Sequence, residues 1–426
     1  MKLRPLPSLA APRCIARAAC ILALTAVAAQ ATAAPRTAAH HAPPKAPAPA
    51  APAAVRDGQA EARLIEVYRL VGSGQVRQAL ERAETLVRDH PNFQLAQLVY
   101  GDLLTARTRP LRGWGDVPDG LGANGSQALS DLREESLLRL RALRERPPAG
   151  AVPSQFLQVS PRSKHAIAVD TSRARLYLFE NTPAGLKLVS DYYISVGKLG
   201  TDKAIEGDLR TPLGVYYVTS NLDPRSLKDF YGAGALPINY PNPYDARRGK
   251  TGGGIWLHGT PPAQYSRPPK ATDGCVVLAN PDLEHILRSV EVRSTPVVIA
   301  PSLKWVPQAS LQAEGRSFAD ALAAWRAART SGDVRRVSAF YASDFTNGAG
   351  KTLPEWLPQL KVEVDRTRGR ELDLKDLSYL RWTDSADTMV VTFGEVPAGA
   401  RTGPVKRQYW MRQGPQWKIF FEGVIG

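Results

Sequence analysis

The sequence has 426 residues, a formal net charge of +15 at pH 7, 43% hydrophobic residues and 22% charged residues. This length allows two or three domains, and the composition is that of an ordinary globular chain, which excludes an intrinsically disordered protein. The arginines are spread along the chain and not clustered, so specific nucleic-acid binding is not expected, whereas another anionic partner suits the charge.

The first 34 residues have the pattern of a secretory signal peptide. Lys2, Arg4, Arg13 and Arg17 come before and around the start of the apolar run AACILALTAVAA, and small residues follow at a cleavage site. The run is shorter than the about 20 residues that a membrane-spanning helix needs, although an uncleaved signal anchor is an alternative. We therefore expect residues 1–34 to be removed, leaving a periplasmic protein with no transmembrane segment.

Residues 35–56 are rich in alanine and proline and should form an extended linker, and residues 57–147 have helical periodicity. Gly74, Ala79 and Pro91 occur at intervals that resemble one tetratricopeptide repeat, in which small residues let two helices pack closely and proline ends the second. The region is expected either to dock a partner, such as an envelope protein, or to extend the packing of an enzyme domain.

The last helix of this region, near Ser126 to Arg146, carries several arginines. We expect them to form a solvated face. They are Arg133, Arg139, Arg141, Arg144 and Arg146.

Residues 155–302 are expected to form a mainly β catalytic domain. Six β-branched and aromatic runs are separated by Gly, Pro, Asn and Asp, as is typical of strands. The runs are AIAV, ARLYLFE, GLKLVSDYYISV, GVYYVTS, GIWLH and TPVVIA.

Cys275 is the one cysteine expected in the mature chain, because Cys14 and Cys20 leave with the signal peptide. A lone thiol in an oxidising compartment cannot form an internal disulfide. It is either a small buried hydrophobic residue or a nucleophile, and its place in the polar segment TDGC favours the nucleophile.

A histidine lies seventeen residues before this cysteine, at the end of the strand-like run IWLH. An unperturbed thiol is mostly protonated at neutral pH, so an imidazole such as that of His258 is needed to take its proton. Gly274 has no Cβ, so it permits a positive φ and a close backbone approach in the turn. The backbone amides of Asp273, Gly274 and Cys275 are then expected to bind an oxyanion, as acyl transfer requires.

These residues resemble the catalytic motif of the L,D-transpeptidase (YkuD) family. Asp273 stands where the family usually has histidine, and Val277 where it usually has arginine or asparagine, which puts substrate carboxylate recognition at that point in doubt. An upstream segment, Lys203 to Val218, is similar to the K-x-x-E-G-D-x-R-T-P-x-G-x-Y stretch of one branch of the family. The matching motif positions are His258, Gly259, Thr272, Gly274, Cys275 and Val276.

The resemblance implies an enzyme that needs no cofactor, in which the backbone carbonyl of Gly259 orients the imidazole of His258. It also implies that Arg210 lies near the site, where its guanidinium either faces a peptide carboxylate or pairs with Glu206 or Asp208. We add Thr272 as a substrate-binding candidate. Metal ligation is not expected, because His258 and His285 are too few ligands around the cysteine.

A loop rich in Gly, Pro and Asn, residues 229–254, is expected to form a lid or one wall of the cleft. Tyr231 is its candidate for substrate binding. Tyr240 and Tyr244 either share this role or anchor the loop.

After a linker at residues 301–315, residues 316–426 resemble the SnoaL-like, or nuclear transport factor 2-like (NTF2-like), α+β cone. The run SFADALAAWRAARTSGDVRRVSAFYASDF predicts two helices, and four strand patterns follow. We expect binding or assembly here, including a homodimer through the sheet. The aromatic residues expected to fill its core or to line a pocket are Trp325, Tyr341, Phe345, Trp382, Trp410 and Phe421.

The sequence thus predicts a multidomain protein with a periplasmic, cysteine-dependent acyltransferase at its centre, acting on peptidoglycan stem peptides. Its acyl acceptor is an amine, giving a 3-3 crosslink or a wall-anchored protein. The alternatives are an amidase or peptidase that uses water, and a noncatalytic scaffold that only holds peptidoglycan.

Overall fold

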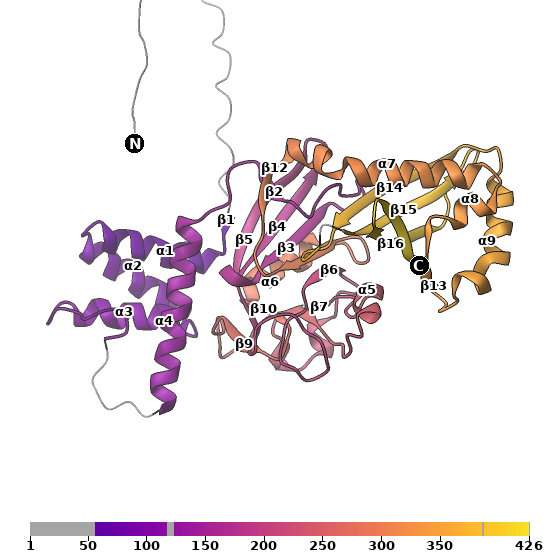
Figure 1. Cartoon of the computed structure of the whole chain (residues 1–426). Coiled ribbons are helices and arrows are strands. Elements are labelled where there is room, and N and C mark those ends of the chain that lie inside the picture. The colour runs from indigo at the N-terminus through magenta and orange to yellow at the C-terminus, as the bar shows by residue number, and fades with distance from the viewer. Residues whose placement is uncertain (1–55, 117–122, 386, 426) are drawn as a thin grey trace, which may run out of the picture. The chain divides into compact units, whose positions relative to one another are not determined.

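The computed structural model describes residues 56–116, 123–385 and 387–425 (Figure 1). The expected signal peptide and nearly all of the Ala/Pro-rich linker lie outside these residues. None of the described helices is long and apolar enough to cross a membrane.

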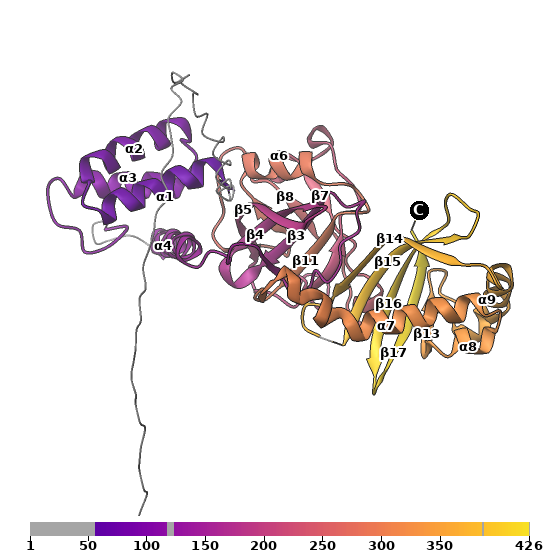
Figure 2. The ribbon, with the colours of Figure 1, turned by 90° about the horizontal axis from the view of Figure 1, so that it is seen from above.

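Four helices form the N-terminal part of the described chain: α1 (Gln59–Gly72), α2 (Val76–Asp89), α3 (Gln94–Thr105) and α4 (Ala123–Arg144). Figure 2 shows α1, α2 and α3 side by side. Small residues allow this close packing, since Ala79 and Ala83 of α2 are buried in the helical core. That core also contains Tyr265 and Ala279, so the helices pack on residues of the following domain.

One arginine of α4 contradicts the expected solvated face. The side chain of Arg139 is 2% exposed and forms ion pairs with Glu61 and Glu135, both at 2.7 Å. Glu61 also pairs with Arg175 at 2.8 Å. Burial by itself would raise the pKa of Glu61, but the two guanidinium groups outweigh it and hold that pKa at about 2. A buried charge must find a partner, and here the partners come from far along the chain.

The central domain contains a curved sheet with the strand order β6-β11-β3-β4-β5-β10-β8-β7, and the short strands β1 (Arg56–Asp57) and β9 (Lys270–Thr272) also pair with β5. All six expected strand runs are confirmed. The other bounds are β3 His165–Asp170, β4 Arg175–Thr182, β5 Gly185–Gly197, β6 Gly214–Tyr217, β7 Ala235–Pro237, β8 Trp256–His258, β10 Val276–Leu278 and β11 Pro296–Ala300, with helices α5 Pro243–Arg247 and α6 Asn280–Ser289.

The sheet is apolar on both faces because each face covers a different core. In β3, Ala166 and Ala168 belong to a core shared with the C-terminal domain. Ile167 and Val169, which alternate with them, belong to a second core within the central domain. This two-residue alternation explains why the strands appear in the sequence as nearly continuous apolar runs.

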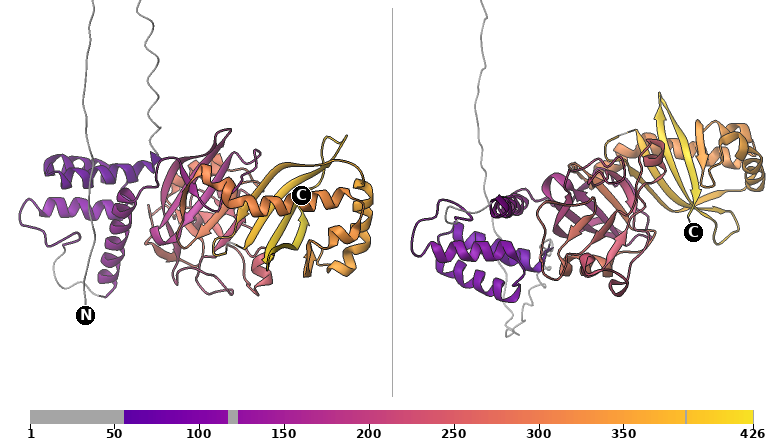
Figure 3. Two further views of the ribbon diagram at one scale, coloured as in Figure 1. Left: turned by 45° about the horizontal axis from the view of Figure 1, so that its top comes forward. Right: turned by 90° about the horizontal axis from the view of Figure 1, so that it is seen from below.

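The C-terminal domain is a five-stranded sheet, ordered β13-β17-β16-β15-β14, packed with three helices. Figure 3 shows the long helix α7 lying along this sheet. The expected second helix is shorter than predicted, because strand β13 begins at Tyr341, and α9 adds a helix that the sequence analysis does not predict. The bounds are α7 Leu311–Thr330, α8 Val334–Ser338, β13 Tyr341–Asn347, α9 Leu353–Thr367, β14 Leu372–Arg381, β15 Thr388–Pro397, β16 Val405–Gln413 and β17 Gln416–Val424.

The segment expected to be a linker is ordered structure. Strand β12 (Trp305–Pro307) pairs with β2 (Ala151–Pro153), and α7 begins at Leu311. The central and C-terminal domains share one apolar core, which includes Tyr217 and Trp382.

The C-terminal sheet is used on both of its faces. On the helical face Trp410 packs against Phe318. On the opposite face the guanidinium carbon of Arg407 lies 3.3 Å from the ring centroid of Tyr217 in the central domain. The aromatic residues of this domain mostly fill its core, since Trp325, Trp382 and Trp410 are each at most 1% exposed.

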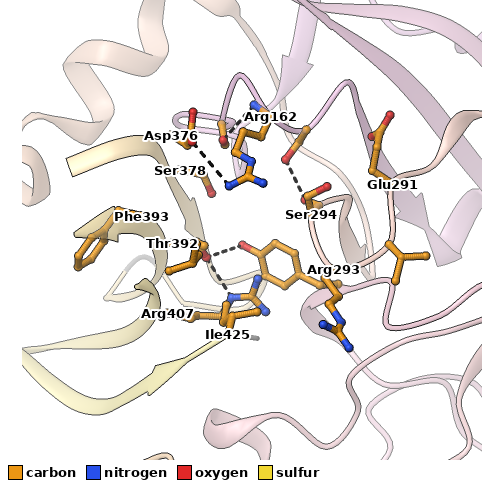
Figure 4. Close-up of a pocket in the computed structure, with 16 residues that line it drawn as sticks. Arg162, Glu291, Arg293, Ser294, Asp376, Ser378, Thr392, Phe393, Arg407 and Ile425 are labelled. Atoms are coloured by element: carbon orange, nitrogen blue, oxygen red, sulfur yellow. Dashed lines mark hydrogen bonds and ion pairs between the residues drawn. The ribbon is translucent and has the colours of Figure 1, made fainter. Parts of the chain in front are cut away.

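A pocket of about 500 Å³ lies where the central domain meets the C-terminal sheet (Figure 4). In it, the Thr392 hydroxyl lies 3.5 Å from the Tyr217 hydroxyl and accepts a hydrogen bond from Arg407 Nε at 3.0 Å. None of the candidate catalytic residues lines this pocket among the described residues.

Candidate active site

Two short strands bring His258 and Cys275 to the same face of the sheet. Strands β8 and β10 are parallel neighbours, with Val276 opposite Leu257 and Val277 opposite His258. Cys275 comes directly before β10. Leu257 and Val276 point into the core of the central domain, so alternation places His258 and Cys275 on the other face. Strand geometry puts the Cα atoms of these two residues about 8 Å apart, a separation that a cysteine and a histidine side chain can bridge.

The imidazole of His258, the candidate base, is buried beside a backbone carbonyl. The residue is 1% exposed, and its Nδ1 lies 2.7 Å from the carbonyl oxygen of Gly259. With the proton on Nδ1, the imidazole donates to that carbonyl and its Nε2 is left as an acceptor. Burial is the main cause of a lowered pKa, about 4 for this histidine. The imidazole is therefore uncharged at neutral pH.

The thiol of Cys275 is also neutral in the resting structure. Burial raises its pKa, and the Trp256 backbone N–H and the charge of Arg267 oppose that rise only in part. The half-buried side chain lies with its sulfur 3.6 Å from the carbonyl oxygen of Gly254. Within the described residues no hydrogen bond joins this sulfur to His258.

The hydroxyl of Thr272 closes the TDGC turn through two hydrogen bonds. The Thr272 hydroxyl donates to the carbonyl oxygen of Cys275 at 2.7 Å and accepts from the Gly274 amide at 3.1 Å. Two expectations need correction for this reason. Thr272 is 2% exposed with its hydroxyl engaged, so it shapes the turn and does not face substrate. The Gly274 amide is likewise occupied, which leaves the amides of Asp273 and Cys275 as the expected oxyanion donors.

Gly274 is required for its positive φ and for a close backbone approach, the two properties that the sequence predicts for it. Its φ is +128°, a value that L side chains rarely adopt. A Cβ at this position would lie 2.7 Å from the carbonyl oxygen of Arg210. The Gly274 carbonyl oxygen accepts a hydrogen bond from the Thr211 hydroxyl at 2.9 Å. The upstream segment thus contacts the cysteine turn directly.

The upstream segment is ordered by a buried lysine and its carboxylate. Lys203 Nζ lies 2.8 Å from Asp208 Oδ1, and Asp208 also accepts from the backbone amides of Ala204 and Arg210. Desolvation acts to raise the pKa of Asp208, but Lys203 and these amides hold it at about 2. The exposed guanidinium of Arg210 donates to the Thr201 carbonyl oxygen at 3.0 Å, so neither expected carboxylate partner binds it.

Asp273, at the departure from the family motif, is exposed. It pairs with Lys198 at 2.8 Å. An exposed pair of this kind contributes little to stability.

Only one of the loop tyrosines stands beside the base. The half-buried ring of Tyr231 lies 5.0 Å from that of His258 and 4.8 Å from that of Trp256. Tyr240 and Tyr244 are 5% and 8% exposed, so they anchor the loop.

Asn280 belongs to the site, although no sequence motif points to it. Its side-chain oxygen accepts from the amides of Ala233 and Thr260, and its amide group donates to the Thr260 carbonyl oxygen. A Cβ on Gly259 would lie 2.0 Å from that side-chain oxygen, which explains the glycine after His258. A single asparagine at the start of a helix gives no signal of this role.

Within the described residues no group of three or more His, Cys, Asp and Glu side chains is arranged to hold a metal ion.

Comparison with known families agrees with this geometry. Residues 164–299 match the L,D-transpeptidase catalytic domain, YkuD, and residues 317–423 match the NTF2-like C-terminal domain of Cds6. The chain therefore carries a YkuD catalytic domain followed by an NTF2-like domain, as its motifs indicated. The helical region lies outside both matches, and its likeness to a tetratricopeptide repeat stays a prediction.

Two solved structures are similar over most of their own length. Bd1075 from Bdellovibrio bacteriovorus has a TM-score of 0.55 and 25% identity, covering 64% of this chain and 98% of that protein. The helical cell shape determining protein Pgp2 from Campylobacter jejuni has a TM-score of 0.51 and 23% identity, covering 63% of this chain and 95% of that protein. The second likeness shows the fold alone. Among curated proteins no sequence relative of the chain is found.

Proposed function

We propose that the protein is an exported L,D-transpeptidase, a cysteine-dependent acyltransferase that acts on peptidoglycan stem peptides. The observation that carries this proposal is the parallel pairing of β8 with β10, which places His258 and Cys275 on one face. The YkuD match supports the substrate class. The basic charge of the chain suits a wall that carries free carboxylates.

The reaction begins with two neutral groups. As the Cys275 sulfur attacks the carbonyl carbon of the L,D-amide, His258 Nε2 takes the thiol proton, and the Gly259 carbonyl stabilises the imidazolium through Nδ1–H. The amides of Asp273 and Cys275 bind the oxyanion. The imidazolium then gives its proton to the leaving amine of the terminal D-residue, and a thioester remains on the sulfur.

The second half of the reaction transfers the acyl group to an acceptor. An amine of a neighbouring stem peptide gives a 3-3 crosslink, and a lysine of an envelope protein gives a wall anchor. The contact of the Tyr231 ring with that of His258, at 5.0 Å between centroids, supports a role for this tyrosine in binding the stem peptide.

In the alternative function water hydrolyses the same thioester, and the protein is an amidase or peptidase that shortens stem peptides. A noncatalytic scaffold is the other alternative. The helical and NTF2-like domains could bind partners in either case, including a second copy of the chain.

Purified protein incubated with tetrapeptide-containing muropeptides separates these functions. We expect 3-3 crosslinked dimers together with the released terminal D-residue, measured by liquid chromatography and mass spectrometry. Tripeptides without dimers would show water as the acceptor. No product from a folded protein would contradict enzymatic function.

Cys275→Ala is the matched control. It should abolish all products while the unfolding temperature stays near that of the wild type. A scaffold would keep its role in cells with this substitution, whereas the enzyme would lose it.

A further inference from the structure

The loop between β8 and β9, residues 259–269, is braced by the helical region. The ring of Tyr265 stacks on Phe93 with centroids 4.4 Å apart, and its backbone amide donates to the Asn92 carbonyl oxygen at 3.0 Å. The next residue, Ser266, hydrogen-bonds to Glu135 of α4 at 2.9 Å. The helices therefore fix the main chain that leads to the next side chain, Arg267.

Arg267 is a buried cation close to the catalytic pair. The residue is 8% exposed, and its guanidinium carbon lies 4.4 Å from the ring centroid of Phe230. The same Phe230 ring also lies 5.7 Å from that of His258 between centroids. The Tyr193 hydroxyl donates to the backbone carbonyl oxygen of Arg267 at 3.0 Å, which fixes the residue from the sheet side.

Within the described residues no carboxylate forms an ion pair with this guanidinium. Arg267 lines a cavity of about 390 Å³ together with Phe230, Lys198 and Asp273. The one carboxylate of that lining, Asp273, is bound to Lys198 at 2.8 Å. Burying a cation without an anion is costly, and a carboxylate entering from the cavity would remove that cost.

We propose that Arg267 binds the terminal carboxylate of the stem peptide, which belongs to the D-residue that leaves when Cys275 attacks. This inference rests on the proposed function. The scissile nitrogen and this carboxylate are attached to the same carbon atom, so the carboxylate must bind close to the sulfur and the imidazole, and Arg267 contacts the same Phe230 ring as His258 does. Arginine can bind a carboxylate through two parallel hydrogen bonds, which adds specificity.

This assignment also accounts for Val277, which stands where the family usually has arginine or asparagine. The side chain of Val277 is buried and has no hydrogen-bond donor. The carboxylate-binding cation is supplied by the loop and not by the strand that follows the cysteine. Arg210 is less suited, because its exposed guanidinium is held by the Thr201 carbonyl oxygen.

Binding to the Cys275→Ala variant tests the inference without turnover. The probes are a synthetic stem tetrapeptide with a free terminal carboxylate and the same peptide with a terminal amide, titrated by calorimetry. We expect the acid to bind about 10- to 150-fold more tightly than the amide, the range for a charged hydrogen-bonded pair. In the double variant Cys275→Ala/Arg267→Gln that preference should vanish, and Arg267→Lys should restore part of it.

Arg225→Gln, which removes an exposed loop cation on the same Cys275→Ala background, is the control and should keep the preference. Equal binding of acid and amide by Cys275→Ala would overturn the inference. So would loss of the preference with Arg210→Gln and not with Arg267→Gln. Turnover by the wild type tests the proposed function separately. Cleavage of the stem peptide without preferential binding of the acid would refute the role of Arg267 alone. Preferential binding of the acid without cleavage would refute the enzymatic function alone.

Discussion

The catalytic domain is joined to its two neighbours by different physical means. Toward the helices, a buried network of charges joins Glu61 and Arg139 to Arg175. Toward the NTF2-like domain, aromatic packing dominates, with Trp382 lying 4.7 Å from Tyr244 between ring centroids. The first contact braces the loop that carries Arg267. The second merges two domains into one core.

This difference predicts different sensitivities. An apolar contact fails when its volume is removed, and a buried charge network fails when one partner is removed. The helical side should therefore respond to pH and to charge, and the NTF2-like side to side-chain size.

The largest effect is expected from Trp382→Ala. The indole is 1% exposed and also packs on Tyr216 at 6.1 Å between ring centroids. Truncation should lower the free energy of unfolding by about 5 kcal/mol, measured by urea denaturation. The control Leu357→Ala, at a position 38% exposed, should cost far less. Equal losses of unfolding free energy in the two variants would show that the two domains do not share one core at this contact.

The next effect is expected from Glu61→Gln. Loss of this carboxylate leaves the guanidinium groups of Arg139 and Arg175 short of one partner in a buried site, which should cost about 4 kcal/mol. The same denaturation experiment measures it. Glu66→Gln, on the exposed face of α1, is the matched control and should change stability little. If Glu61→Gln left the free energy of unfolding unchanged, the packing of the helices would not depend on this network.

A third effect is a dependence on pH. Burial first, and then the charge of Glu61, raise the pKa of Asp282 to about 7. The folded chain thus binds this proton more tightly than the unfolded chain, so the stabilisation is present below the ordinary pKa of the carboxyl and is lost as pH rises through about 7. Between about pH 4.5 and about pH 7.5 the wild type should lose about 3 kcal/mol relative to Asp282→Asn.

The measurement is urea denaturation of both proteins at the two pH values. Glu284→Gln, which changes an exposed carboxylate of the same helix, should follow the wild type. Parallel pH curves for the wild type and Asp282→Asn would contradict a raised pKa.

The smallest effect is expected from Asp384→Asn. Its ion pair with Arg248, at 3.2 Å, lies at the rim of the NTF2-like contact and is partly exposed. Solvent and salt screen such pairs, so the loss should be about 0.5 kcal/mol and should shrink in high salt. A loss as large as that of Trp382→Ala would show that charge, not packing, joins these domains.

Much of this organisation could be predicted from the sequence because it depends on local pattern. The six strand runs of the catalytic domain and the first helix of the NTF2-like domain follow from periodicity. Helix α9 is not predicted from periodicity, although Thr352 and Glu355 form a capping box that signals its start.

Features that depend on distant partners could not be predicted in this way. Arg139 looks like its exposed neighbours on α4, and only the fold brings Glu61 to it. Arg267 is one arginine in a loop, and its nearness to His258 follows from packing on Phe230. The burial of the Thr272 hydroxyl likewise depends on how the turn closes.

The central claim is that Cys275 becomes acylated with His258 as its base, and intact-mass measurement tests it most directly. Incubation with a carbapenem-type β-lactam, an acyl mimic, should add the mass of the opened β-lactam to the wild type at Cys275. Cys275→Ala should gain no mass, and His258→Gln should react about 100-fold more slowly. An unmodified wild type, an adduct at another residue, or equal rates for the wild type and His258→Gln would contradict the account.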